Sequence, residues 1–325
     1  TALAEILTLE EVRQLLEGLP HRNSAPDAET VIKRTEPQVG TPRTSSAKSD
    51  KSRKPVSNTP TFRKVIPIRY SLLQPTTGNG KIEQGLYEPY KSLSIAIEGA
   101  KDHPYPLVES LAMSSVVQPH PTYQPHLPEH LIAEGVLSHV QLESIIYAGE
   151  SHAQFLKGYY RIDENLDSIS AASETEGIRF RRGFFLADGT GTGKGRQVAG
   201  VLLDNYLQGR KKALWISKSE TLLEDARRDW TALGGYAEQI IPLSSFRQGE
   251  VIAIEEGIIF TTYATLRTEA KGDKKSRVQQ VIDWCGTGFD GLIVFDESHC
   301  MSNAASEKGE RGLKKASLQG VAGLK

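Results

Sequence analysis

The sequence predicts an α/β fold in which a parallel β-sheet is flanked by helices. From Leu137 onward, short apolar segments alternate with longer helical segments, and no internal repeat is found. Short apolar strands between helices are typical of a parallel sheet that is buried on both faces. A glycine-rich segment, GTGTGKG at residues 189–195, lies between a predicted strand and a predicted helix. This placement indicates a phosphate-binding turn at the end of the strand.

The individual elements follow from apolar periodicity and from residues that start or stop helices. Ser219 suits the N-cap of one helix, and Gly209 and Gly234 follow the last turns of two helices. The predicted helices span residues 137–156, 196–209, 219–234 and 276–286. The predicted strands span residues 184–188, 212–217, 257–263 and 291–297.

Four parts are expected along the chain. Residues 1–20 contain a short amphipathic helix whose apolar face suits local packing or a partner. Residues 21–64 are rich in Pro, Ser, Thr and Lys and are predicted to be a disordered basic linker. Residues 65–136 form a Pro-rich lead-in that is expected to pack on the last part, residues 137–325.

The charge of the linker leaves two interpretations open. Between Val31 and Lys64 there are nine Lys or Arg residues and two acids, a net charge of +7. Such a segment can contact nucleic-acid phosphates. It can equally be a solvated linker without a partner.

The composition is that of a globular protein and argues against several classes. Hydrophobic residues make up 38% and charged residues 24% of the 325 residues, and the net charge is −1. No apolar run approaches the roughly 20 residues needed to cross a bilayer, so no membrane partner is expected. Cys285 and Cys300 form no CxxC pair. This spacing argues against a zinc site or a disulfide framework and fits a reducing compartment.

Residues 184–196, FFLADGTGTGKGR, carry the most specific site signal. Phosphates require backbone N–H groups at close range and a helix N-terminus, and glycine allows the needed φ angles without a Cβ clash. Lys194 would add a mobile cation for the β- and γ-phosphates. ATP is therefore the predicted ligand, and the alternative is a glycine-rich turn without one. The expected binding residues are Gly189, Thr190, Gly191, Thr192, Gly193, Lys194, Gly195 and Arg196.

Two positions depart from the strict phosphate-loop pattern. Asp188 stands where that pattern has its first glycine. Gly195 follows Lys194, where a Ser or Thr hydroxyl usually binds Mg²⁺. The loop thus lacks one usual metal ligand. Either Mg²⁺ is held by water and Asp296 instead, or the affinity for the metal is low.

A second site signal lies at the end of the last predicted strand, in GLIVFDESHC at residues 291–300. ATP hydrolysis needs charge neutralisation at the phosphates and a positioned water. Asp296 suits the metal role, and Glu297 suits the general base that orients the water. His299 would couple this site to neighbouring motifs. The alternative is an acidic strand end at the surface.

Together these motifs resemble the DExD/H-box ATPases of helicase superfamily 2, and more closely the strawberry-notch family of helicase-like proteins. The DESH sequence at residues 296–299 resembles the DExH box. The stretches that fit the family pattern are Leu107–Ser110, Pro125–Pro128, Leu137–Gln141, Phe184–Arg196, Gly209–Ser219, Thr261–Leu266 and Phe295–Asn303. The resemblance covers roughly residues 103–304 and includes Gly195, so this glycine is not expected to disable the loop.

The resemblance implies a RecA-like lobe that binds ATP and Mg²⁺ and works with a second RecA-like lobe on the backbone of DNA or RNA. Residues 137–325 would be the first lobe only, because no Ser-Ala-Thr motif or second α/β repeat follows. Without arginine fingers from a second lobe, the chain alone is expected to be a weak ATPase. Gln141 would read adenine or be an ordinary helix residue. The expected nucleic-acid contacts, which could also be ordinary loop residues, are Ser217, Lys218, Thr261, Thr262 and Tyr263.

Two functions remain open at this point. The first is an ATP-hydrolysing, helicase-like lobe of a nucleic-acid translocase or remodeller. The second is an ATP-dependent regulatory or scaffold protein, associated with transcription, that separates no strands. A cytoplasmic location is expected for a bacterial protein and a nuclear location for a eukaryotic one.

Overall fold

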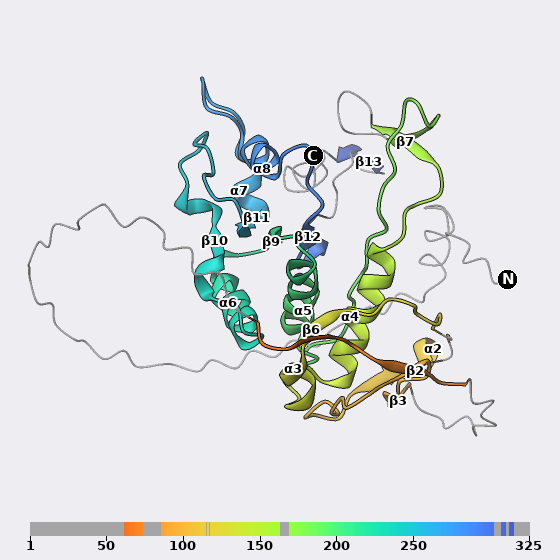
Figure 1. Ribbon diagram of the computed structural model, residues 1–325. Coiled ribbons are helices and arrows are strands. Elements are labelled where there is room, and N and C mark those ends of the chain that lie inside the picture. The colour runs from red at the N-terminus through yellow and green to blue at the C-terminus, as the bar shows by residue number, and fades with distance from the viewer. Residues whose placement is uncertain are drawn as a thin grey trace, which may run out of the picture. The chain divides into compact units, whose positions relative to one another are not determined.

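A four-stranded parallel sheet forms the centre of the fold (Figure 1). The computed structural model describes residues 62–74, 86–114, 116, 118–162 and 169–301, and the backbone of 307–309 and 312–314. The strand order is β10-β11-β9-β12, and each neighbouring pair is parallel. The strands are β9 (Lys212–Ser217), β10 (Ile240–Pro242), β11 (Gly257–Thr262) and β12 (Leu292–Phe295). The predicted α/β class with a parallel sheet is confirmed. The predicted helix in residues 1–20 and all but the end of the predicted linker lie outside the described residues.

Alternate side chains of β9 enter two separate hydrophobic cores. Ala213 and Trp215 pack in one core with α5 (Lys194–Leu207) and α6 (Leu223–Ala232). Leu214 and Ile216 pack in the other core. That second core also receives α7 (Tyr263–Leu266) and α8 (Arg277–Cys285). Successive side chains of a strand point to opposite faces, so helices on both sides bury β9 completely beyond its first residue.

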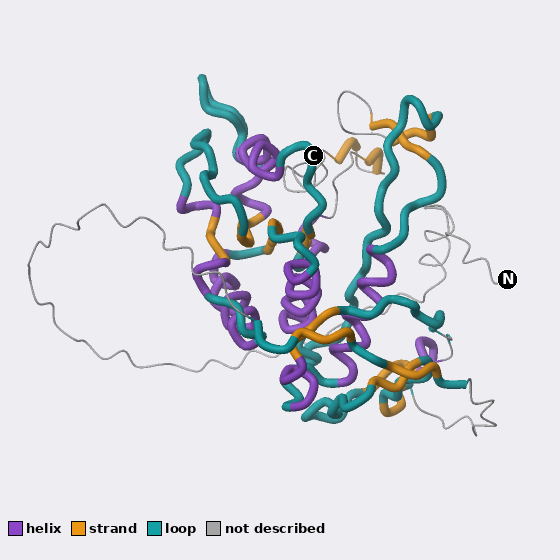
Figure 2. Tube along the Cα trace, viewed as in Figure 1, coloured by secondary structure: helices purple, strands orange, loops and turns teal. Residues whose placement is uncertain are grey.

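The segment 184–188 is not a strand, and the prediction of a strand there is wrong. It belongs to the long loop between β8 and α5 (Figure 2). Within the described residues β12 pairs with β9 alone, and its side chains Ile293 and Phe295 are exposed. Phe185 is 77% exposed. A strand exists only where a neighbour completes its hydrogen-bond ladder, and no described strand pairs with residues 184–188.

The lead-in consists of short antiparallel pairs and two helices. β1 (Val65–Pro67) pairs with β6 (His126–Pro128), β2 (Tyr70–Leu72) with β4 (Ile95–Ile97), and β3 (Tyr87–Pro89) with β5 (Val108–Ser110). The helices before the glycine loop are α2 (Leu111–Ser114), α3 (Glu129–Ala133) and α4 (His139–His152). A hairpin of β7 (Tyr159–Ile162) and β8 (Ile169–Ala172) follows α4, and β13 (Glu307–Gly309) pairs with β14 (Gly312–Lys314).

The lead-in shares one hydrophobic core with α5. Leu127 and Leu131 are fully buried in the same cluster as Leu203 of α5. Fully burying a leucine side chain stabilises a fold by about 1.5–3 kcal/mol before entropic costs. This packing therefore joins the lead-in to α5 through a common core.

A buried polar cluster ties the lead-in to α5. Asp204 accepts hydrogen bonds from the Tyr123 hydroxyl, at 2.5 Å, and from the backbone N–H of His126, at 2.7 Å. Gln208 donates to both Asp204 and the Tyr123 oxygen. Burial raises the pKa of Asp204, and the hydrogen bonds from Tyr123 and His126 oppose that rise. The carboxylate thus depends on these donors inside the protein.

Tyr123→Phe is expected to destabilise the fold by about 1–3 kcal/mol, because it leaves a buried carboxylate oxygen without its donor. Urea unfolding followed by circular dichroism measures the change. Tyr159→Phe is the matched control, since the Tyr159 hydroxyl bonds Glu174 on the exposed hairpin, and no measurable change is expected. Equal unfolding midpoints for Tyr123→Phe and the wild type would show that the cluster does not stabilise the fold.

Candidate functional site

The glycine loop ends directly at the first residue of α5. Gly191 has a φ angle of 97° and Gly193 a φ angle of 76°, both in the left-handed region that favours glycine. Gly193 is the N-cap of α5, and no side chain caps this helix end. The first backbone N–H groups of a helix have no partner within the helix. This end of α5 therefore offers donors to an anion, as expected for a phosphate loop.

Lys194 folds back over the loop that precedes it. Its ammonium donates to the carbonyl oxygens of Asp188, at 2.9 Å, and Gly189, at 3.1 Å. Thr192 Oγ1 donates to the same Gly189 oxygen, at 3.1 Å. These bonds hold the Lys194 ammonium against the loop backbone. The Thr190 side chain, in the same loop, is exposed.

Asp188, which replaces the first glycine of the strict pattern, is an anchor for the loop. Its carboxylate accepts a hydrogen bond of 2.8 Å from Gln197 Nε2 on the first turn of α5. Gln197 is almost fully buried, and its Oε1 has no partner among the described residues. Gln197 is not predicted as a site residue from the sequence, because a helix glutamine carries no signal of its own.

Gln141, on the first turn of α4, bridges two backbone segments. Its Oε1 accepts from the Ser138 N–H at 3.0 Å, and its Nε2 donates to the Thr192 carbonyl at 3.1 Å. A Cβ atom on Gly193 would lie 2.4 Å from Gln141 Nε2. The φ angle at position 193 thus favours glycine, and a Cβ there would displace the Gln141 amide from its place beside the loop. The predicted adenine contact stays a prediction, and in this conformation the amide of Gln141 binds the loop.

Arg196 and Gly195 face α6. Arg196 donates through Nε to Asp229 at 3.3 Å and through a terminal nitrogen to the Val136 carbonyl at 3.2 Å. A Cβ atom on Gly195 would lie 2.3 Å from Asp229 Oδ2. The start of α5 is therefore held from two sides, by the lead-in and by α6. Asp229 was missed from the sequence, although the unusual glycine at 195 could have signalled a close neighbour.

The acidic end of β12 is built around Asp296. Its backbone N–H donates to the Ile216 carbonyl at 2.8 Å, which extends the pairing with β9. Its carboxylate accepts from the Ser217 hydroxyl at 2.7 Å, and its carbonyl accepts from the Tyr263 hydroxyl at 2.9 Å. Burial, followed by the negative charge of Asp296, raises the pKa of Tyr263. The ends of three parallel strands thus converge on Asp296, at the sheet edge where such folds bind ligands.

Glu297 has a backbone conformation that non-glycine residues rarely adopt. Its φ angle is 52°, and a left-handed residue with a Cβ costs about 1–2 kcal/mol. Such strain clusters at functional sites. His299 Nδ1 lies 3.2 Å from Glu297 Oε2, and both side chains are well exposed. Within the predicted DExH box, Glu297 and His299 are therefore adjacent and accessible.

The residues expected to contact nucleic acid differ in accessibility. Lys218 is exposed at the end of β9. The side chains of Ser217, Thr261, Thr262 and Tyr263 are buried, and Thr262 caps α7 through the Thr265 N–H. Among the described residues no hydrogen bond or ion pair joins the glycine loop to Asp296 or Glu297.

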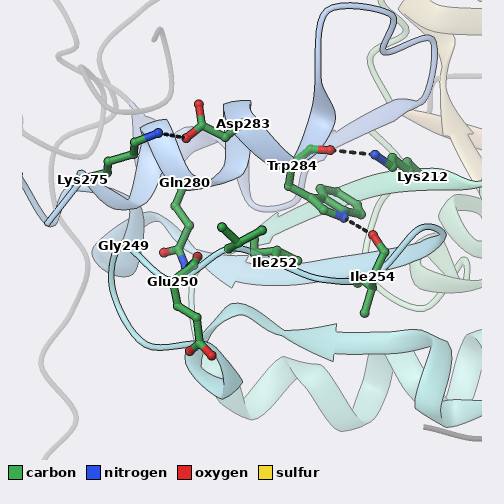
Figure 3. Close-up of a pocket in the computed structure, with 10 residues that line it drawn as sticks. Lys212, Gly249, Glu250, Ile252, Ile254, Lys275, Gln280, Asp283 and Trp284 are labelled. Atoms are coloured by element: carbon green, nitrogen blue, oxygen red, sulfur yellow. Dashed lines mark hydrogen bonds and ion pairs between the residues drawn. The ribbon is translucent and has the colours of Figure 1, made fainter. Parts of the chain in front are cut away.

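A cavity of about 170 Å³ lies away from these residues, at the start of β9 (Figure 3). Its polar groups are satisfied within the protein, because Lys212 donates to the Trp284 carbonyl and Trp284 Nε1 donates to the Ile254 carbonyl. Lys275 forms an ion pair with Asp283 at its rim. None of the predicted site residues lines this cavity, so it does not compete with the glycine loop as a candidate site.

Metal and membrane features are sparse in the part of the chain that the structure describes. No cluster of three or more His, Cys, Asp or Glu residues there could by itself hold a metal ion. Both cysteines, Cys285 and Cys300, are free. No described helix is long and apolar enough to span a membrane.

Residues 102–325 match the family described as P-loop containing NTP hydrolase pore-1. The chain belongs to this family. The match includes both the glycine loop and the acidic strand end, and the resemblance to strawberry-notch proteins is confirmed by curated relatives. No solved structure matches the chain significantly.

Three of these relatives illustrate the similarity. Protein strawberry notch homolog 1 of Gallus gallus is 37% identical over 249 residues, which is 73% of this chain and 18% of that protein. Protein FORGETTER 1 of Arabidopsis thaliana is 38% identical, over 64% of this chain and 15% of its own length. Protein strawberry notch homolog 2 of Homo sapiens is 40% identical, over 64% and 14%. The chain thus spans less than a fifth of each of these relatives.

Gln141→Ala is expected to loosen the phosphate loop of this P-loop protein, because it removes the bonds to Ser138 and Thr192. Hydrogen exchange should become about fivefold faster at the Ser138 amide, which donates to Gln141, and at the Gln197 amide, which donates to the Gly193 carbonyl of the loop. This factor is the equivalent of a hydrogen bond worth about 1 kcal/mol. Gln279→Ala is the control, since Gln279 bonds Asp283 on the exposed face of α8. Unchanged exchange at both amides in the Gln141 variant would mean that α4 does not position the loop.

Proposed function

We propose that this chain is the ATP-binding lobe of a helicase-like ATPase that translocates on or remodels nucleic acid. The observation that carries the proposal is the uncapped N-terminus of α5, which follows two left-handed glycines and begins with Lys194. Free helix N–H groups beside a mobile ammonium form a binding site for a polyphosphate. The family membership and the DESH sequence at the end of β12 support ATP hydrolysis as the outcome of that binding.

The residues fit ATP and Mg²⁺ by their chemistry. Added Cβ atoms at Gly189 and Gly191 would meet no atom within 4 Å, so the loop backbone is open on that side. Mg²⁺ prefers oxygen ligands such as the Asp296 carboxylate, and when bound it neutralises charge on the phosphates. Glu297 would orient the attacking water as general base, and His299, beside it, would position that carboxylate.

Completion of the ATPase by a second RecA-like lobe is part of the proposal. Arginine fingers from a partner lobe are worth about 10³–10⁵ in rate where they have been measured. The relatives are five or more times longer than the matched region, so they have room for such a lobe. Because the relatives come from animals and a plant, a nuclear location is favoured over a bacterial cytoplasm.

One observation favours the alternative function, an ATP-dependent regulatory protein that does not move along nucleic acid. Four of the five expected nucleic-acid contacts have buried side chains, and Ser217 and Tyr263 bond to Asp296. Ser217 and Tyr263 therefore contact the end of β12, which carries the proposed metal ligand Asp296. Nucleic-acid contact at this edge would then rest on Lys218 and on backbone N–H groups.

Lys194→Ala should weaken ATP binding about ten- to a hundred-fold, the loss expected for a hydrogen bond to a charged group of about 1.5–3 kcal/mol. Calorimetry measures this affinity. Wild-type ATP affinity in the Lys194 variant would remove the binding assignment.

Glu297→Gln should leave ATP affinity unchanged, because it keeps the shape of the side chain. In a protein that includes the second lobe, it should lower ATP turnover by about 10²–10⁴, because it removes the general base. A phosphate-release assay measures the turnover.

Binding to nucleic acid is expected to be insensitive to base sequence and to weaken as salt rises, because each neutralised phosphate releases counterions. Affinities for DNA and RNA across a salt series, measured with residues 1–64 deleted, separate the lobe from the basic linker. Lys218→Ala should weaken the remaining binding further, whereas Lys275→Ala, which removes a lysine paired with Asp283 on α8, should not. Complete loss of binding with the linker would favour the regulatory function.

A further inference from the structure

The residue after the phosphate-loop lysine has an unusual neighbour. In loops of this kind a Ser or Thr follows the lysine, and its hydroxyl binds the Mg²⁺ of the nucleotide. Here that residue is Gly195, and the position where its Cβ would stand lies 2.3 Å from Asp229 Oδ2 and 3.4 Å from Asp229 Cγ. A carboxylate oxygen thus occupies the space into which the missing hydroxyl side chain would extend.

The two oxygens of Asp229 have different surroundings. Oδ1 accepts from Arg196 Nε at 3.3 Å, and Arg196 is itself held by the Val136 carbonyl. Oδ2 has no hydrogen-bond partner among the described residues and is the oxygen that faces Gly195. The side chain is 14% exposed. One oxygen therefore fixes the carboxylate, and the other is available at the start of α5.

We propose that Asp229 supplies the oxygen ligand for Mg²⁺ that Ser or Thr supplies in other phosphate loops, and that Gly195 makes room for it. The proposal rests on the proposed function, because the metal arrives with the nucleotide. Mg²⁺ is typically bound by one or two carboxylates together with substrate phosphates. Asp229 and Asp296 would provide the two carboxylates, one from α6 and one from the end of β12.

A purely structural role for Asp229 would give a different Mg²⁺ dependence of nucleotide binding. If the carboxylate served only to hold Arg196, then Asn at position 229 would still accept the Arg196 hydrogen bond and nucleotide binding would keep its dependence on Mg²⁺. A metal ligand instead requires the charged oxygen, because neutral Asn is a poorer ligand for a hard cation. The Mg²⁺ dependence of nucleotide affinity therefore separates the two roles.

The test measures the affinity of the chain for a fluorescent ADP analogue with excess Mg²⁺ and with EDTA, and it follows Mn²⁺ bound with ADP by electron paramagnetic resonance. The variants are Asp229→Asn and the double variant Gly195→Ser with Asp229→Ala, which restores a hydroxyl where the carboxylate stood. Asp225→Asn is the matched control, one turn earlier on α6, where Asp225 pairs with Arg228. Thermal unfolding confirms that each variant is folded.

In the wild type and in Asp225→Asn, Mg²⁺ should tighten ADP binding. Asp229→Asn should lose about tenfold or more of that gain, the scale seen when groups around a metal are removed, and should lose the Mn²⁺ signal. The double variant should recover both. An unchanged Mg²⁺ effect in a folded Asp229→Asn protein overturns the role of Asp229 while leaving the proposed function intact. Absence of ADP binding by the wild type overturns the proposed function itself.

Discussion

The parallel pairing of β9 with β11 and β12 is the constraint on which the site depends. In a parallel sheet all strands end at the same edge, so Ser217, Thr262 and Asp296 meet there although the chain separates them by tens of residues. The pairing is stabilised from both sides, because β9 sends alternate side chains into two helical layers. A slip of one residue would exchange these two sets of side chains and disconnect Asp296 from Ser217.

The phosphate loop is positioned by segments that precede and follow it. Gln141 of α4 holds the Thr192 carbonyl, Gln197 holds the Asp188 carboxylate, and Arg196 joins the start of α5 to the lead-in. Loops that bind phosphate gain affinity when their backbone is ordered before the ligand arrives, since less entropy is then lost on binding. The lead-in therefore has a physical role in the site, which its Pro-rich sequence does not suggest.

Two features concentrate charge and strain at the candidate site residues. The left-handed backbone of Glu297 stores strain at the end of β12, and Asp229 places a carboxylate against a glycine that has no side chain to exclude it. A carboxylate so close to the free N–H groups at the start of α5 opposes the binding of an anion unless a cation accompanies that anion. Under the proposed function, Mg²⁺ bound with the nucleotide would be that cation.

The sequence by itself determined the α/β class, the order of the principal helices and strands, and the two motifs, because apolar periodicity and glycine conformation are local properties. It also singled out Lys194, Asp296 and Glu297 as candidate site residues, because their residue types have few other uses in that pattern. It failed at residues 184–188, where an apolar run has no described strand to pair with. Only the tertiary structure decided the burial of Tyr263, the contact of Gln141 with Thr192 and the approach of Asp229 to Gly195. These contacts join residues that are 33 to 51 positions apart, and no local pattern specifies which distant side chains a packed core brings together.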